Sequence, residues 1–208
     1  MGISLHSILL RRFRRLYPKP ASELVFNGEY QLLVAVLLSA QCTDKKVNQV
    51  TPELFRSYPS FEALSQARLS DLFTILRPIN YYKTKARHLR SAALMVHAEH
   101  SGKLPLSREG LIRLDGVGQK TANVVLSELE VVRTFPVDTH VFRVSRRLGI
   151  ASGHTPAKVE KELMRTFESR HWRNLHHWLI FHGRRVCKAR SPDCAGCGLS
   201  DVCPSSDN

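Results

Sequence analysis

The stretch from residue 111 to residue 125 reads L-I-R-L-D-G-V-G-Q-K-T-A-N-V-V. Its apolar residues predict the end of one helix and the start of another, with a tight turn at Gly116 and Gly118 between them. Glycine permits positive φ and close approach of the backbone to a ligand. The free amides at the start of the second helix, together with its dipole, favour an anion. The stretch therefore predicts a glycine hairpin between two helices, with an anion site at the second.

This helix-hairpin-helix pattern indicates contact with a nucleic-acid backbone without sequence readout. We expect the contacts to come from residues of the turn and of the helix start: Gly116, Val117, Gly118 and Gln119. Lys120 falls in the first turn of the second helix, where the dipole and partial burial both favour a neutral amine that can attack carbon. The alternative is a lysine that only contacts phosphate.

A carboxylate follows a short distance along the chain. In Phe135-Pro136-Val137-Asp138-Thr139-His140, Asp138 is placed to cap a helix over 139–148. Capping alone explains an aspartate here. An amine and a carboxylate that converge from two helices would also form a nucleophile and its basic or electrostatic partner.

Four of the five cysteines crowd the C-terminus in the pattern C-x6-C-x2-C-x5-C. They are Cys187, Cys194, Cys197 and Cys203. In a reducing cytoplasm such a tetrathiolate indicates a metal centre, either zinc or an iron-sulfur cluster. Only one pair has the short spacing typical of zinc sites. A redox dithiol at Cys194 and Cys197 leaves two neighbouring thiols unexplained.

The loop that these cysteines bracket is basic. Arg184 precedes it, and Lys188 and Arg190 lie within it. A loop anchored by a metal can present cations to phosphates at little ordering cost. The alternative is a solvated basic loop.

The composition fits this reading. The 208 residues carry a formal charge of +13, and the basic residues recur along the chain, so we expect a polyanionic partner on a folded basic face. The longest apolar stretch, 32–38, is too short to span a bilayer and predicts a buried helix. No secretion signal is visible, so we expect a cytoplasmic protein with no membrane association.

Helical spacing of apolar residues and the lack of hairpin-forming strand pairs predict an all-α fold. Prolines, including Pro52, are expected to divide the chain into about ten short helices. Thr155 and Pro156 supply an N-cap and a first helical residue for one of them.

Three of these features, together with Leu38-Ser39-Ala40-Gln41-Cys42-Thr43-Asp44, occur in the order and spacing of the endonuclease III family, which the chain closely resembles over nearly its whole length. The resemblance implies two all-α lobes that flank a DNA-binding cleft. A helical-barrel lobe with the helix-hairpin-helix would cover 22–132, and a cluster lobe would combine 1–21 with 133–208. It also implies a 4Fe-4S cluster on the four cysteines, in place of zinc.

The activity implied is that of a bifunctional DNA glycosylase and abasic-site lyase that removes oxidised pyrimidines in base excision repair. A damaged base is flipped out of duplex DNA, Lys120 attacks the sugar carbon, Asp138 assists, and β-elimination from the Schiff base cleaves the strand 3′ to the abasic site. Ser39, Asp44 and His140 match pocket positions of the family, and Gln41 matches the residue that fills the vacated space. Helix capping by Ser39 or Asp44 and a core role for His140 remain as alternatives. We expect the protein to act as a monomer on DNA with damaged bases or abasic sites.

One segment departs from the family. Where a glycine and an aliphatic wedge are usual, this chain reads Ile79-Asn80-Tyr81-Tyr82. Tyr81 can take the wedge role by stacking, since an aromatic ring can replace an unstacked base. The alternative is a tyrosine packed against Tyr82 or a neighbouring helix.

Other functions remain open at this point. An abasic-site lyase with weak glycosylase activity shares all these motifs, and a non-catalytic iron-sulfur DNA-binding module would use Lys120 only for phosphate. The adenine-mismatch glycosylases are disfavoured because they usually lack a lysine at this position. An electron carrier would explain the cysteines and not the hairpin.

Overall fold

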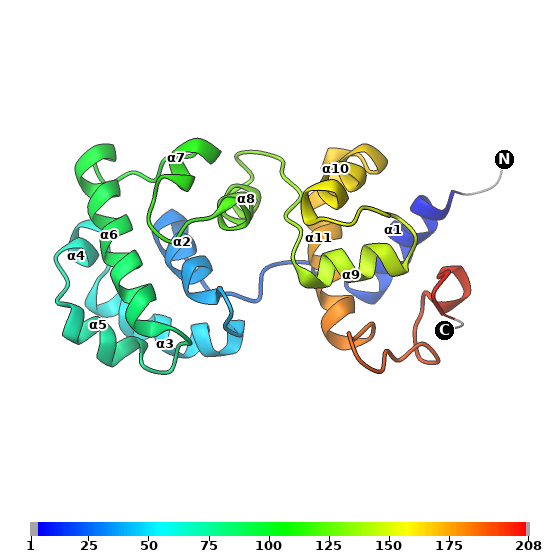
Figure 1. Ribbon diagram of the computed structural model, residues 1–208, viewed down its shortest axis with the longest axis horizontal. Helices are drawn as coiled ribbons and strands as arrows, with labels where there is room; N and C mark the ends of the chain where they lie inside the picture. The colour runs from blue at the N-terminus through cyan, green and yellow to red at the C-terminus, as the bar shows by residue number, and fades with distance from the viewer. Residues whose placement is uncertain (1–3, 207–208) are drawn as a thin grey trace. The chain divides into compact units, whose positions relative to one another are not determined.

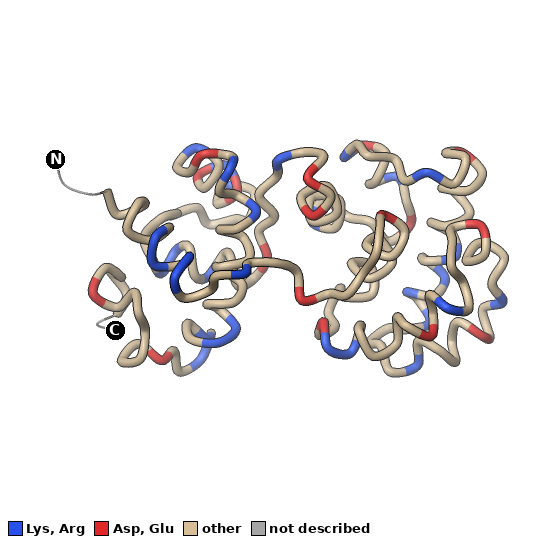
Figure 2. Tube along the Cα trace, turned by 180° about the vertical axis from the view of Figure 1, so that it is seen from behind, with Lys and Arg blue, Asp and Glu red and all other residues tan. Residues whose placement is uncertain are grey.

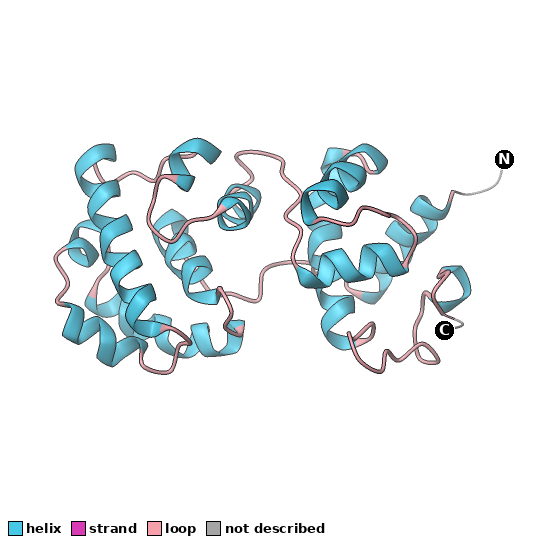
Figure 3. Cartoon of the chain, in the orientation of Figure 1, coloured by secondary structure: helices cyan, strands magenta, loops and turns pink. Residues whose placement is uncertain are grey.

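The computed structural model describes residues 4–206 and contains helices and loops without a strand in that range, as Figure 3 shows. The all-α prediction is confirmed. The helices, in chain order, are α1 (Leu5–Leu16), α2 (Gly28–Ser39), α3 (Asp44–Ser57), α4 (Phe61–Ser65), α5 (Leu69–Leu76), α6 (Tyr82–His100), α7 (Arg108–Ile112), α8 (Gln119–Glu128), α9 (Thr139–Arg147), α10 (Pro156–Thr166) and α11 (Trp172–Arg185), with short 3₁₀ turns η1 (Ser169–His171) and η2 (Ser200–Val202) (Figure 1).

The chain divides into two compact units. One consists of Met1–Ala21 with Arg133–Asn208, and the other of Ser22–Val132. Each unit has its own cluster of buried apolar side chains. None of the described helices combines the length and the apolar run that crossing a bilayer requires.

The Ser22–Val132 unit contains α2 to α8, and α2 lies at its centre. Seven successive side chains of this helix, residues 32–38, are buried, as predicted for the longest apolar stretch. A helix that is apolar on all sides must be covered on all sides. Helices α3, α6 and α8 contact it and supply that cover.

One proline does not end a helix. Pro52 lies inside α3, where the sequence predicted a boundary. A proline inside a helix costs about 3 kcal/mol because one backbone bond is lost and its ring crowds the preceding turn. The neighbours Val50, Thr51 and Leu54 are all buried, and their burial offsets that cost. Tertiary packing therefore overrides the local rule here.

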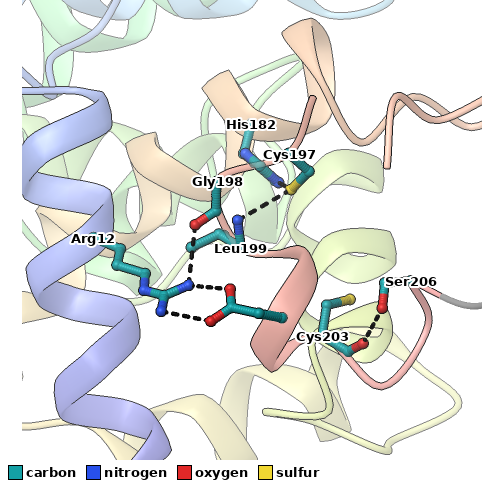
Figure 4. A network of polar contacts seen from close by, with 8 residues as sticks. Arg12, His182, Cys197, Gly198, Leu199, Cys203 and Ser206 are labelled. Carbon is teal, nitrogen blue, oxygen red and sulfur yellow. Dashed lines mark hydrogen bonds and ion pairs between the residues drawn. The ribbon is translucent and has the colours of Figure 1, made fainter. Parts of the chain in front are cut away.

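The other unit joins both ends of the chain. Phe13 of α1 stacks on Trp178 of α11 with ring centroids 6.0 Å apart, and the Trp178 indole donates to the Tyr17 carbonyl at 2.9 Å. Arg12 of α1 donates to the Gly198 carbonyl at 3.2 Å and forms a two-pronged ion pair with Asp201 (Figure 4). These contacts fasten the N-terminal helix to the cysteine-rich segment.

Two helix starts form as the sequence predicted. The Thr155 hydroxyl accepts from the Lys158 amide, and Pro156 is the first residue of α10. The Asp138 carboxylate accepts from the Val141 amide at 2.7 Å and caps α9.

Candidate active site and cysteine cluster

The glycine hairpin lies between α7 and α8. Gly116 has a φ of +79°, and a Cβ at this position would lie 2.8 Å from Nδ1 of His88. The turn therefore requires glycine here for its backbone and for space. Val117 is buried, and its amide donates to the Leu114 carbonyl at 3.0 Å. Val117, predicted as a DNA contact, thus anchors the hairpin to the core.

Helix α8 begins with an open N-terminus. Its N-cap is Gly118, which supplies no side-chain cap, and the first backbone bond of the helix runs from Ala122 to Gly118. The amides of Gln119, Lys120 and Thr121 precede that bond and have no carbonyl of their own helix to pair with. A Cβ at Gly118 would meet no heavy atom within 4 Å. The site has the space and the donors for a phosphate.

Lys120 lies in the first turn of α8, as predicted, but it is exposed, so the partial burial that the sequence predicted is wrong. Asp138 is half-buried at the start of α9, where one carboxylate oxygen is engaged by the helix cap. The two residues belong to different compact units. Each is presented at a helix start by local sequence.

His140 is the second residue of α9. Its Nδ1 is 3.2 Å from the Arg143 guanidinium. Burial is the main cause that lowers the pKa of His140, with Arg143 and Arg184 acting in the same direction and Asp138 opposing them. The neutral imidazole, which can accept a hydrogen bond from Arg143, is therefore favoured.

Ser39 and Asp44 flank the loop between α2 and α3. The Ser39 hydroxyl donates to the Val36 carbonyl at 2.8 Å within its own helix. The cap of α3 is Thr43, whose hydroxyl accepts from the Lys46 amide. Capping thus does not account for Ser39 or Asp44, the alternative that the sequence left open.

The four cysteines line one cavity of about 300 Å³ in the cysteine-rich segment. Several donors face their sulfurs: the Arg147 guanidinium lies 3.4 Å from Cys187 Sγ, the His182 Nε2 lies 3.5 Å from Cys197 Sγ, and the Leu199 amide donates to Cys197 Sγ at 3.4 Å. Figure 4 shows the last two. Burial raises the pKa of the Cys197 and Cys203 thiols.

Zinc and an iron-sulfur cluster make different demands on the four sulfurs. Zinc needs four sulfurs within about 2.3 Å of one point. Across residues 4–206, no three cysteine, histidine or acidic side chains converge closely enough to hold a single ion. The four sulfurs line one cavity and polar groups lie close to them, so the cysteine set can hold a metal centre.

The loop between Cys187 and Cys194 is held from α9. Arg147 donates to the carbonyls of Lys188 and Ala189 at 2.7 and 3.2 Å, and Arg143 donates to the Cys187 carbonyl. The side chains of Arg184, Lys188 and Arg190 are exposed. A backbone held by these bonds thus carries the exposed side chains of Lys188 and Arg190.

Residues 34–169 match the model of the HhH-GPD superfamily of base excision DNA repair proteins. The curated endonuclease III of Rickettsia felis is 41% identical over 92% of this chain and 90% of its own length, and that of Bacillus subtilis is 43% identical over 90% and 86%. This chain belongs to the endonuclease III family.

Solved structures agree with the family assignment. A trapped endonuclease III–DNA covalent intermediate and a non-covalent endonuclease III–DNA complex each match with a TM-score of 0.91 and 39% identity, over 99% of this chain and 98% of theirs. A thermostable thymine-DNA glycosylase at 20% identity shares the fold, with a TM-score of 0.84. The protein is accordingly a base excision repair enzyme that acts on damaged DNA, a DNA glycosylase and abasic-site lyase.

In this endonuclease III, Gln41 and Tyr81 lie in two different loops, and both have an unusual backbone conformation. Both residues adopt the left-handed conformation, with φ of 53° and 57°. Tyr81 is 67% exposed, and it is Tyr82 that packs edge-on against Phe73. The packing alternative for Tyr81 is therefore wrong, and the ring is available to a ligand.

Sequence reasoning missed two polar residues of this family member. Lys85 is buried and donates to the Leu38 and Ala40 carbonyls, and Asn80 donates to the Gln41 carbonyl. Helical spacing placed Lys85 on the inner face of α6, where a lysine is rare, and this was the available signal. The signal for Asn80 was its place in the segment that departs from the family pattern, and sequence reasoning drew no role from it.

Proposed function

We propose that Lys120 is the nucleophile of this glycosylase and lyase and that Asp138 is its carboxylate partner. The observation that carries this assignment is the exposed amine beside the unpaired amides at the start of α8. A DNA phosphate bound at those amides brings the adjoining sugar to the amine, because the two groups share one helical turn.

The reaction is a displacement followed by an elimination. The Lys120 amine forms a bond to the sugar carbon of the flipped nucleotide, and the bond from that carbon to the damaged base breaks. Asp138 accepts the amine proton or stabilises positive charge on the sugar. The sugar ring then opens to a Schiff base, a proton leaves the adjacent carbon, and the 3′ phosphate departs by β-elimination.

The substrate is DNA with an oxidised pyrimidine or an abasic site. Gly116, Gly118 and Gln119 would bind its backbone, together with Lys188 and Arg190 of the cysteine loop and Arg184 just before it. Ser39, Asp44 and His140 line the pocket for the flipped base in this proposal, with Gln41 filling the vacated space and Tyr81 stacking on the opposite strand. We propose that the enzyme works in the cytoplasm, associated with the nucleoid through its DNA substrate, and that it acts as a monomer.

The cofactor in this proposal is a 4Fe-4S cluster held by Cys187, Cys194, Cys197 and Cys203. When bound, it would anchor the basic loop and add a fixed charge near the DNA contacts. The cavity that all four thiols line supports this assignment. Iron and acid-labile sulfide in equal amounts, four of each per chain, are expected on analysis of the purified protein. One zinc per chain would overturn the assignment.

Borohydride trapping tests the nucleophile. The protein is mixed with a duplex that carries one thymine glycol, borohydride is added, and the covalent protein–DNA adduct is measured. We expect an adduct that Lys120→Gln abolishes while DNA binding persists.

A matched control is Lys158→Gln, since Lys158 is another exposed lysine in the first turn of a helix. This variant should trap DNA as the unchanged protein does. Trapping that survives Lys120→Gln would assign the Schiff base to another amine. An adduct with an abasic site and none with thymine glycol would show a lyase with weak glycosylase activity.

A further inference from the structure

Two loops of the Ser22–Val132 unit come together although they are far apart in sequence. One joins α2 to α3 and carries Gln41, and the other joins α5 to α6 and carries Tyr81. Both residues adopt left-handed backbone conformations, which are uncommon outside glycine. Such conformations persist when the surrounding structure fixes them, and they cluster at ligand-binding sites.

Three hydrogen bonds fix the first loop from the second and from the start of α6. The Asn80 side-chain amide donates to the Gln41 carbonyl at 2.7 Å. The Lys85 amine donates to the carbonyls of Leu38 and Ala40 at 2.8 and 2.5 Å. The carbonyls of Leu38, Ala40 and Gln41, at the end of α2 and just after it, thus all accept hydrogen bonds from the segment 80–85.

The second loop is tied to the same helix. The Lys85 amide donates to the Tyr81 carbonyl at 3.0 Å, so Lys85 holds Tyr81 through its backbone and the other loop through its side chain. Ile79, just before Asn80, is 2% exposed and lies in the core. The exposed Gln41 and Tyr81 side chains therefore project from a rigid base.

Asn80 is the residue of this arrangement that can be replaced with little effect on the stability of the fold. Lys85 is buried beneath the loop, and its loss would leave unpaired carbonyls near the core. Asn80 is exposed, so its amide is free to be removed without opening a cavity. It also stands where the family usually has a glycine, which cannot make this bond.

We infer that Asn80 is a positioning residue that couples Gln41 and Tyr81 into one two-pronged probe of the DNA duplex. Gln41 enters the space of the flipped base, Tyr81 stacks on the opposite strand, and Asn80 sets the spacing between the two. This inference rests on the proposed function for the roles of Gln41 and Tyr81. The bond from the Asn80 amide to the Gln41 carbonyl is the contact through which Asn80 acts.

The test is a double-mutant cycle on binding. The test DNA is a duplex with one tetrahydrofuran abasic analogue opposite 2-aminopurine. Its affinity and its fluorescence are measured with the unchanged protein, Asn80→Ala, Gln41→Ala and the double variant. We expect Asn80→Ala to weaken duplex binding about three- to tenfold, the range for one hydrogen bond, and to change the 2-aminopurine signal. In the Gln41→Ala background the same change should have much less effect, since residues that act together are not additive.

Asn48→Ala is the matched control. Asn48 also donates from its side-chain amide to a loop carbonyl of this unit, that of Glu23 at 2.8 Å, and its loss should leave the probe signal unchanged. Thermal unfolding of both variants checks that they remain folded. Additive losses at Asn80 and Gln41, or an equal loss for Asn80→Ala on single-stranded abasic DNA, would overturn the inference.

The tetrahydrofuran analogue lacks the hydroxyl needed to form a Schiff base, so this readout does not depend on the chemistry at Lys120. Coupling between Asn80 and Gln41 without a borohydride adduct would support the probe and reject the nucleophile assignment. A Lys120-dependent adduct without coupling between Asn80 and Gln41 would support the nucleophile assignment and reject the two-pronged probe.

Discussion

Backbone conformation and the space for a side chain restrict the residue type at some positions of this protein and not at others. Gly116 needs positive φ and has no room for a Cβ against His88. Tyr81 also has positive φ, yet it carries a large exposed ring. A bulky residue in this conformation is costly, and such a conformation persists where the surrounding structure fixes the backbone.

Replacement of Tyr81 by alanine should separate duplex from single-stranded activity. We expect Tyr81→Ala to lower kcat/KM on a thymine-glycol duplex by about tenfold or more, because base–aromatic stacking contributes about 1–3 kcal/mol. Activity on a single strand with the same lesion should change little. Tyr82→Phe, on the ring that packs against Phe73, serves as the control, and an equal loss on both substrates would reject the wedge role.

At the level of elements, the proposed catalytic residues lie at the starts of two helices, α8 and α9. An uncapped start of α8 leaves amides for phosphate, whereas a start of α9 capped by Asp138 uses one carboxylate oxygen for structure. The same side chain therefore has a structural and a proposed chemical role. These roles differ in what they require, since a cap needs an oxygen and the chemistry needs a negative charge.

Asparagine at position 138 separates the two roles. Asparagine caps helices about as well as aspartate, so Asp138→Asn should change stability by less than about 0.5 kcal/mol. Loss of the charge should lower kcat by about 10²- to 10⁴-fold, the usual contribution of an acid or base. Denaturant unfolding and single-turnover kinetics measure the two effects.

Thr155→Ala is the complementary control for that experiment. It removes the cap of α10 and should cost about 1 kcal/mol without loss of activity. A kcat for Asp138→Asn equal to that of the unchanged protein would leave Asp138 with capping alone.

At the scale of the whole molecule, the net positive charge favours binding to DNA. The formal charge of +13 is spread over both units, and Figure 2 shows Lys and Arg along each of them. Binding to a polyanion should release counterions in proportion to the phosphates neutralised. Acidic residues are interspersed, so only particular cations are expected to contribute.

The salt dependence of DNA affinity identifies these cations. Lys188→Gln should weaken binding uniformly across DNA sequences and reduce the slope of log affinity against log salt by about 0.9, the value for one phosphate contact. Lys161→Gln, an exposed position on α10 outside the proposed contacts, should leave the slope unchanged. Equal slopes for the two variants would remove Lys188 from the interface.

The sequence by itself determined the features that depend on neighbours along the chain. Helical periodicity gave the all-α class and the buried segment at 32–38, side-chain oxygens before helices gave the caps at Asp138 and Thr155, and the glycines gave the hairpin. Each rests on interactions within a few residues, so a local pattern is enough to reveal it.

Only the tertiary structure decided the contacts between distant segments. The Asn80 bond to Gln41 spans 39 residues, the Lys85 bond to Leu38 spans 47, and the Arg147 contact with Cys187 spans 40. The continuation of α3 through Pro52 and the burial of Val117 likewise depend on the core that surrounds them. Such contacts form because packing brings the segments together, and no period or spacing within either segment encodes its partner.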